Sequence, residues 1–404
     1  MFSHNMLEVF YLEQKSRQQL RELTYFIRRI KEILTMKILF SAGDVSGDIN
    51  TAGIVAELKR KYPSAQLGGL GGPAMQAAGF VSDFEFSKFN KMGYWEVIKN
   101  LSFFLAAQKK FIQKMRDEKP NVLVCVDFSG FNKKLVVEAN KLGIPVLWFI
   151  APMIWVWKKE KWLRFFEKHK AHIACIFPFE PRHWLPRVKT VDFVGNPLLE
   201  NFDTAAFGEK TVINAQEKFT LALIAGSREQ EVRKILPFMV ECAKNLKKLY
   251  PKMKILVSKT SLSQDLYECA AALEDIEFET EFPKVLQTAD FALATSGTAS
   301  LQLGLAGVGH IVLYKTSPLT FLIFKILIKK KPLMGLSNIV VEKEIMPEFL
   351  QDDMTVENVL AAAQKILGNS AKQEEMISEL RKLRGLLGDK KTSEEVVNLI
   401  ENII

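Results

Sequence analysis

One stretch, residues 221–234 with the sequence LALIAGSREQEVRK, constrains the fold of this chain more than any other. Its first five residues are apolar, as in strands that are buried on both faces of a parallel sheet. Gly226 then ends the run and permits a tight turn, and Ser227 and Gln230 have the spacing of a capping box, which marks a helix start. Apolar residues continue at helical spacing as far as Val240. The stretch therefore predicts a strand, a turn and a helix, the unit of an α/β fold.

The turn of this unit can bind an anion. Its backbone N–H groups lie at the positive end of a helix dipole, which favours phosphate. Arg228 is expected in the first turn of the helix, where the dipole alone favours an acid, and a planar guanidinium there suits a phosphate oxygen. The alternative is an ordinary β–α corner with a solvated arginine, and this stretch alone is consistent with both.

The same alternation of strand and helix patterns occurs in two series. It predicts parallel sheets. The first series has strands at residues 37–42, 65–69, 121–126, 144–150 and 173–177; the second has strands at residues 221–225, 254–258, 276–278, 291–295 and 309–314. A Gly-Asn-Pro turn and a polar segment separate the series near residue 200. We therefore expect two Rossmann-like domains, residues 36–200 and 201–366, that face each other across a cleft.

The two ends of the chain lie outside these series. Residues 1–35 form a polar, helix-favouring leader, which is either an upstream extension from a misplaced start codon or an accessory helix. Residues 367–404 are helical in pattern, and we expect C-terminal helices that can return to the first domain. The sequence has no signal peptide and no apolar stretch of transmembrane length.

Charge and cysteine usage narrow the range of functions. The net charge of +9 implies an anionic partner, which can be nucleic acid, a phosphorylated substrate or a membrane surface. The four cysteines are scattered, mostly in apolar runs, as in a reduced cytosolic protein. No Cys/His cluster has metal-ligand spacing.

Polar residues follow several predicted strands at their carboxyl ends, where open α/β sheets bind ligands. The loop after the first strand resembles a dinucleotide fingerprint only loosely, because the third glycine is missing. Its candidate residues are Gly43, Ser46, Gly47 and Asp48. Asp127 follows the strand at residues 121–126, where an acid is well placed for catalysis, although it also suits a helix N-cap. Ser296, Gly297 and Thr298 form a second anion cradle at a helix start, which favours a diphosphate ligand.

A basic, aromatic stretch at residues 91–111 predicts an amphipathic helix. Its apolar face can hold Tyr94, Trp95, Ile98, Leu101, Phe104 and Leu105. Between Lys88 and Arg116 there are seven basic residues and one acid. Such a helix fits the surface of an anionic membrane. The alternative is a core helix with solvated lysines.

The motifs occur in the order and spacing of a known family. From residue 36 to about residue 366 the chain resembles lipid-A-disaccharide synthase, an inverting glycosyltransferase with the two-domain GT-B fold. The shared motifs include AGDVSGD (42–48), GGPAMQAAGF (71–80), MGYWEV (92–97), VDFSGFN (126–132), FPFE (177–180), FVGNPL (193–198), GSREQE (226–231), SGTASLQ (296–302), LSNIV (336–340) and PEFLQ (347–351).

The resemblance implies a reaction in which UDP-2,3-diacylglucosamine donates its sugar to the 6-hydroxyl of 2,3-diacylglucosamine 1-phosphate. The products are the β-1,6 disaccharide 1-phosphate and UDP. Asp127 matches the family's base, which takes the proton of the acceptor hydroxyl. The implied UDP-sugar site comprises Gly226, Ser227, Arg228, Glu231, Ser296, Gly297, Thr298, Gln302 and Asn338. Donors of this kind can stabilise the departing UDP, and we expect no metal or other cofactor.

Because both substrates are acylated, the resemblance also implies an enzyme on the inner face of the bacterial inner membrane. The predicted contact residues are Tyr94, Trp95, Ile98, Phe104 and Leu105. Four positions depart from the family pattern: Asp44 replaces Glu, Gly130 replaces an acid, Asn196 replaces His and Gln302 replaces Glu. A glutamine can still hydrogen-bond a ribose, but without the charge.

Two other functions stay open on these residues. One is a GT-B enzyme with another sugar nucleotide or acceptor, such as a non-hydrolysing epimerase-like enzyme. The other is a non-catalytic, membrane-associated relative. Nucleic-acid binding is disfavoured, because the basic residues alternate with apolar groups and form no base-stacking groove.

Overall fold

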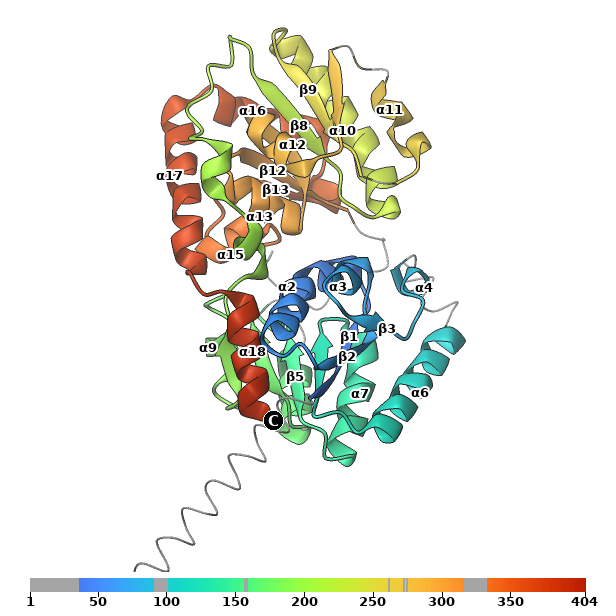
Figure 1. Cartoon of the computed structure of the whole chain (residues 1–404). Coiled ribbons are helices and arrows are strands. Elements are labelled where there is room, and N and C mark those ends of the chain that lie inside the picture. The colour runs from blue at the N-terminus through green and yellow to red at the C-terminus, as the bar shows by residue number, and fades with distance from the viewer. Residues whose placement is uncertain are drawn as a thin grey trace, which may run out of the picture.

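The structure is a computed structural model that describes residues 36–90, 101–155, 159–260, 262–271, 273, 275–315 and 333–404. These residues form two α/β domains, one above the other in Figure 1, and each is built on a parallel sheet. The predicted fold class is confirmed.

The first domain is organised around a seven-stranded sheet with the order β3-β2-β1-β4-β5-β6-β7. Its strands are β1 (Lys37–Ala42), β2 (Gln66–Leu70), β3 (Val81–Ser82), β4 (Val122–Val126), β5 (Val146–Phe149), β6 (His172–Cys175) and β7 (Val191–Phe193). The apolar strand β4 is buried along its whole length, as expected for a parallel sheet covered on both faces. Ser41 of β1 pairs with Cys125 of β4, so the loops that follow these two strands emerge side by side.

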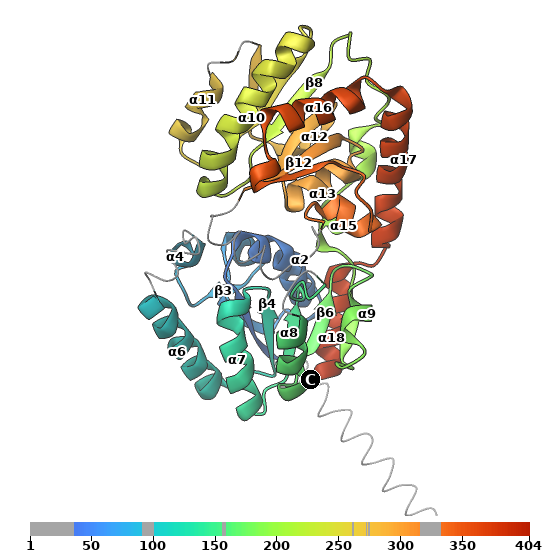
Figure 2. The ribbon, with the colours of Figure 1, turned by 180° about the vertical axis from the view of Figure 1, so that it is seen from behind.

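Two layers of helices cover this sheet. On one face lie α2 (Val45–Lys61) and α3 (Pro73–Ala77); on the other lie α6 (Leu101–Glu118), α7 (Ser129–Lys141) and α8 (Lys159–Lys168), which Figure 2 shows from behind. The short helices α4 (Ser87–Asn90) and α9 (Pro181–Trp184) complete the domain. The 3-10 helices η1 (Pro197–Asn201) and η2 (Thr204–Phe207) follow β7.

The second domain has a six-stranded sheet with the order β10-β9-β8-β11-β12-β13. Its strands are β8 (Thr220–Ile224), β9 (Lys254–Ser258), β10 (Ile276–Glu279), β11 (Phe291–Thr295), β12 (Gly309–Tyr314) and β13 (Glu348–Leu350). The helices are α10 (Glu229–Leu249), α11 (Glu268–Ala271), α12 (Phe282–Thr288), α13 (Thr298–Leu305), α15 (Leu336–Val341), α16 (Val356–Leu367) and α17 (Ser370–Leu387), with short 3-10 turns η3 (Gln264–Tyr267) and η4 (Gln351–Asp353).

All ten strands predicted from the sequence are present, with ends within two residues of the prediction. The prediction missed β3, β7 and β13, which have only two or three residues each. Such short segments carry no recognisable period, and they form because they pair with β2, β6 and β12.

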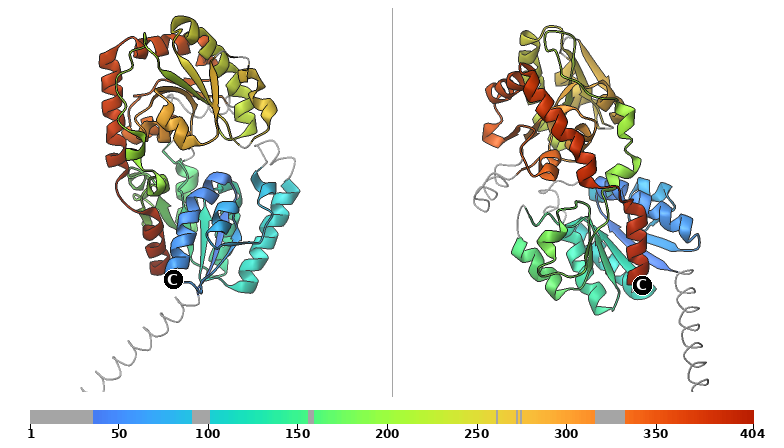
Figure 3. Two further views of the ribbon diagram at one scale, coloured as in Figure 1. Left: turned by 45° about the horizontal axis from the view of Figure 1, so that its top comes forward. Right: turned by 90° about the vertical axis from the view of Figure 1, so that its left-hand side faces the viewer.

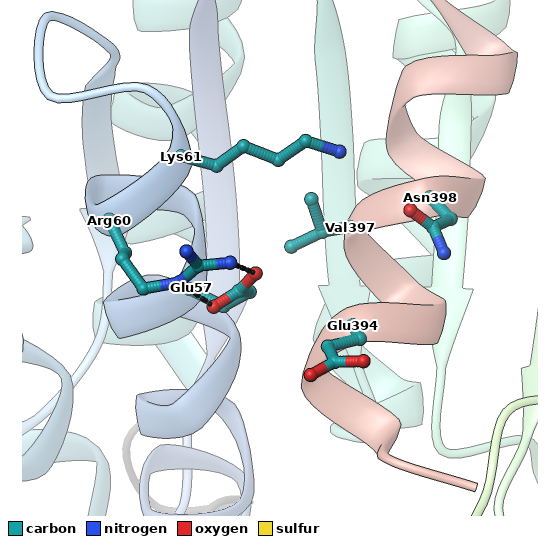
Figure 4. Close-up of a pocket in the computed structure, with 6 residues that line it drawn as sticks. All are labelled: Glu57, Arg60, Lys61, Glu394, Val397 and Asn398. Atoms are coloured by element: carbon teal, nitrogen blue, oxygen red, sulfur yellow. Dashed lines mark hydrogen bonds and ion pairs between the residues drawn. The ribbon is translucent and has the colours of Figure 1, made fainter.

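The C-terminal helices connect the two domains. Helix α17 packs on the second domain, whereas α18 (Thr392–Ile403) lies against α2 of the first domain (Figure 3). The pocket in Figure 4 lies between α2 and α18. The hydroxyl of Tyr62, which follows α2, donates a 2.7 Å hydrogen bond to Glu401 of α18. The segment between β7 and β8 touches the segment between α17 and α18. A Cβ on Gly195, in the first segment, would lie 2.5 Å from the carbonyl oxygen of Lys390, in the second. Among the helices described, none has the length and apolar character needed to cross a bilayer.

Candidate active site

Asp127 lies directly after β4 in a strained turn. Both Asp127 (φ +36°) and Phe128 (φ +37°) have left-handed backbone conformations, which cost non-glycine residues about 1–2 kcal/mol each. Helix α7 begins at Ser129, and its N-cap residue is Phe128, so the alternative role of Asp127 as an N-cap is wrong. Two such residues in succession are a feature of functional sites more than of ordinary strand–helix connections.

The surroundings of Asp127 come from both domains. Burial, and after it the nearby charge of Asp44, raise the pKa of Asp127, and Arg228 opposes the shift; the resulting pKa is about 7. Asp44 belongs to the loop after β1, whereas Arg228 belongs to the second domain. Charges from both domains therefore act on Asp127.

The loop after β1 packs tightly on this turn. A Cβ on Gly43 would lie 2.4 Å from the Phe128 ring, so only glycine fits there. Asp44 caps α2 by accepting hydrogen bonds from Gly47 N (2.7 Å) and the Ser46 hydroxyl (3.2 Å). These contacts give Gly43, Ser46 and Gly47 the role of shaping the loop that holds Asp44.

Asp48, the fourth residue predicted for this loop, has a structural role instead. It is buried, and its carboxylate accepts hydrogen bonds from the backbone of Gly72 (2.9 Å), Ala74 (3.0 Å) and Met75 (3.0 Å). Both carboxylate oxygens are used to hold the neighbouring loop. The prediction that Asp48 faces an acceptor is therefore corrected.

The turn after β8 presents Arg228 to solvent. Gly226 has φ +102°, and a Cβ there would meet the Glu231 carboxylate at 2.5 Å. The Arg228 side chain is 73% exposed, and its guanidinium donates a 2.9 Å hydrogen bond to Glu231. Helix α10 begins at Glu229 with Arg228 as a cap residue that makes no side-chain capping bond, so the predicted capping box of Ser227 with Gln230 is wrong. Glu231 orients the arginine in this state.

The turn after β11 is more open. Gly297 has φ +139°, no atom lies within 4 Å of the position of its missing Cβ, and Thr298 begins α13 with an exposed side chain. Ser296 donates its hydroxyl hydrogen to the carbonyl of Met334 (2.6 Å), so it fixes the next loop. Gln302 is half-buried, and within the described chain no hydrogen bond is seen for its side chain.

Asn338 is fully buried and does not face a donor substrate. Its side-chain N–H groups donate to Met346 O and Glu348, both at 2.7 Å, and its oxygen accepts from the backbone of Ile345 and Met346. The predicted donor contact is therefore corrected. Glu348, which lies in the matched motif PEFLQ, also accepts hydrogen bonds from Gly335 N (2.8 Å) and Met334 N (2.7 Å). The pair holds the loop that Ser296 touches.

We expect Glu348→Gln to lower the free energy of unfolding by about 1–3 kcal/mol, because an amide N–H would then face a buried backbone donor. Urea denaturation measures this change. Glu344→Gln is the matched control, since Glu344 is an exposed acid four residues earlier. Equal stability of the two variants would show that the carboxylate does not hold this loop.

Helix α6 is partly core and partly surface. Phe104 is 7% exposed and packs on Phe89 and Phe128, with ring centroids 5.8 Å and 6.2 Å away, so its predicted membrane contact is wrong. Leu101 and Leu105, one turn apart, are 54% and 56% exposed. Tyr94, Trp95 and Ile98 lie outside the described residues.

The described part of the chain contains no cluster of three or more His, Cys, Asp or Glu side chains suited to a metal ion.

Comparisons with known proteins agree on one family. The model of the lipid-A-disaccharide synthetase family matches residues 38–400. Lipid-A-disaccharide synthase of Myxococcus xanthus is 32% identical over 362 residues, covering 87% of this chain and 94% of the relative. The enzyme of the same name from Coxiella burnetii (strain CbuG_Q212) is 30% identical over 372 residues, covering 91% and 98%.

Solved structures share the two-domain fold. A co-structure of S. aureus MnaA with UDP has a TM-score of 0.61 at 14% identity, covering 91% of this chain and 98% of that one. The calicheamicin glycosyltransferase CalG4 has a TM-score of 0.56 at 14% identity, covering 92% and 99%. Together with the family match, the fold confirms the resemblance seen in the motifs: the chain belongs to the lipid-A-disaccharide synthetase family of glycosyltransferases.

Proposed function

We propose that this chain transfers 2,3-diacylglucosamine from UDP to the 6-hydroxyl of 2,3-diacylglucosamine 1-phosphate, with inversion at the anomeric carbon. Family membership supports the reaction class. One observation supports the mechanism most: the charge of Arg228, in the second domain, acts on the Asp127 carboxyl of the first domain. A base and an anion-binding group from opposite domains are what a single displacement between two bound sugars requires.

Asp127 acts as the general base in this scheme. A base is most efficient when its pKa is near the working pH, and the pKa of Asp127 is raised to about 7. Asp127 takes the proton of the acceptor hydroxyl as its oxygen attacks the anomeric carbon. The bond from that carbon to the UDP oxygen breaks, and UDP leaves with the bonding electron pair. The proton on Asp127 then passes to water.

Arg228 and two helix starts receive the negative charge of the departing UDP. Helices α10 and α13 begin directly after the turns at Gly226 and Gly297, and their free N–H groups favour a diphosphate. The Arg228 guanidinium is exposed and offers further donors beside Glu231. We propose that these groups suffice without a metal ion or other cofactor.

The purified chain should be assayed with UDP-2,3-diacylglucosamine and the acceptor monosaccharide phosphate. Mass spectrometry identifies the disaccharide, and NMR coupling at the new glycosidic bond gives its configuration. Formation of the β-1,6 disaccharide supports the proposal. Absence of this product together with epimerisation of a UDP-sugar would favour the epimerase-like alternative.

We also propose that the enzyme associates with the inner face of the bacterial inner membrane, since its substrates are acylated. We expect Leu101→Ser/Leu105→Ser to weaken binding to anionic vesicles about tenfold or more, because both side chains are exposed on one face of α6. Co-sedimentation measures the binding. The matched control is Leu249→Ser/Leu386→Ser, which changes two exposed leucines of the second domain. Equal losses in both variants would remove α6 as the contact.

A further inference from the structure

The turn that carries Asp127 needs a device that holds it. Asp127 and Phe128 are both left-handed, and no glycine relieves the turn. A strained conformation persists only when its surroundings fix it firmly. The residues that supply this constraint therefore also decide where the Asp127 carboxyl points.

Asn132, in the first turn of α7, is bonded to this turn. Its side-chain N–H groups lie within hydrogen-bond distance of the carbonyls of Asp127 (3.0 Å), Val126 (3.2 Å) and Ser41 (3.2 Å). The backbone N–H of Asn132 also donates to Phe128 O (3.1 Å). One residue thus links the end of β4, the strained turn and the neighbouring strand β1.

Ser41 fixes the orientation of that amide. Its hydroxyl donates a 2.6 Å hydrogen bond to the side-chain oxygen of Asn132, which directs the N–H groups toward the three carbonyls. Ser41 and Asn132 are both fully buried, so neither meets a substrate. Their hydrogen bonds serve the backbone around Asp127.

We propose that Asn132, oriented by Ser41, is the positioning residue that holds the Asp127 turn and thereby fixes the direction of its carboxyl. This inference rests on the proposed role of Asp127 as the base. Asn132 does not touch the reacting atoms, and it acts through the backbone of Asp127. The charged groups that act on Asp127 are Asp44, from the loop after β1, and Arg228, from the start of α10.

Two variants test the proposal. Asn132→Leu keeps the approximate shape and removes the amide, and we expect kcat to fall about 100-fold, the effect of a misplacement of about 1 Å. Ser41→Ala removes one hydrogen bond, and we expect a fall of about fivefold. In both variants we expect the turn to loosen and water to reach Asp127, which lowers the pKa of its carboxyl. The acid limb of the pH profile of kcat/KM should therefore move from about pH 7 toward lower pH.

If Asn132 only stabilised the fold, its substitution would reduce the amount of active enzyme without moving the acid limb of the pH profile. Gln373→Met is the matched control, because Gln373 is also a buried amide that bonds backbone carbonyls, in the second domain. It should lower stability and leave the limb in place. Thermal unfolding and UDP affinity verify the fold of each variant; if Asn132→Leu does not fold, Ser41→Ala decides.

An acid limb that stays at the wild-type pH in the folded variants would overturn the positioning role. The proposed function fails by a different result. If Asp127→Asn keeps its activity with the acid limb unchanged, Asp127 is not the base, whatever the Asn132 variant does. The two failures are therefore distinguishable in one set of assays.

Discussion

Replacing Asp127 by asparagine is expected to lower kcat about 1,000-fold while the affinity for UDP stays within about twofold of wild type, since general-base catalysis contributes about 10²–10⁴-fold. The amide has the shape of the carboxyl but cannot accept the acceptor's proton. UDP is proposed to bind groups of the second domain, which this change leaves in place. Single-turnover kinetics and calorimetric titration with UDP measure the two effects.

Asp44→Asn is the informative companion to this variant. An asparagine can still cap α2 through Gly47, so the loop keeps its shape. Removing the charge of Asp44 removes one cause of the raised pKa of Asp127. We therefore expect most of the turnover to remain and the acid limb of kcat/KM to shift to lower pH.

Full activity in Asp127→Asn would exclude Asp127 as the base.

The fold could be predicted because its strands are long and apolar. β4 is apolar throughout, β1, β8 and β11 each contain an apolar run of three or four residues, and each strand is followed by a helix pattern. The positions of the turns after these strands follow from the same pattern. A candidate site at the strand ends could therefore be predicted from the sequence alone.

The roles of single polar residues were harder to predict, because they depend on partners distant in sequence. Asp48 bonds the loop at residues 72–75, and Asn338 bonds Glu348 and the backbone at residues 345–346. A motif shows that such a residue matters, but not whether it contacts a substrate or another loop. Asn132 is the same case: it stands in a matched motif, and only the packing of α7 against β1 shows what its amide does.

Phe104 shows a related limit. An amphipathic pattern gives the faces of a helix but not which face is covered. The aromatic side of α6 packs on Phe89 and Phe128, and the leucines face outward. The core-helix alternative therefore holds for the aromatic face of α6, and membrane contact stays a prediction for the exposed leucines.

Arg228→Ala is expected to weaken UDP binding about 10- to 100-fold, because charge-assisted hydrogen bonds contribute about 1.5–3 kcal/mol each. Arg228→Lys should recover only part of the loss, since lysine keeps the charge but lacks the planar fork. The matched control is Arg233→Ala. Arg233 lies on the same helix, is 59% exposed and pairs with Glu229 at 2.8 Å, much as Arg228 pairs with Glu231.

The comparison of these two arginines separates the effect of an arginine's position from the effect of losing any exposed, paired arginine. Both are exposed and both are paired with a glutamate of α10, but of the two only Arg228 stands at the turn after β8 and acts on the pKa of Asp127. A loss of UDP affinity confined to Arg228→Ala would place the diphosphate at this turn. Equal affinity in both variants would move the diphosphate away from it, and the departing charge in the proposed reaction would then need another acceptor among the groups at Gly297 and Thr298.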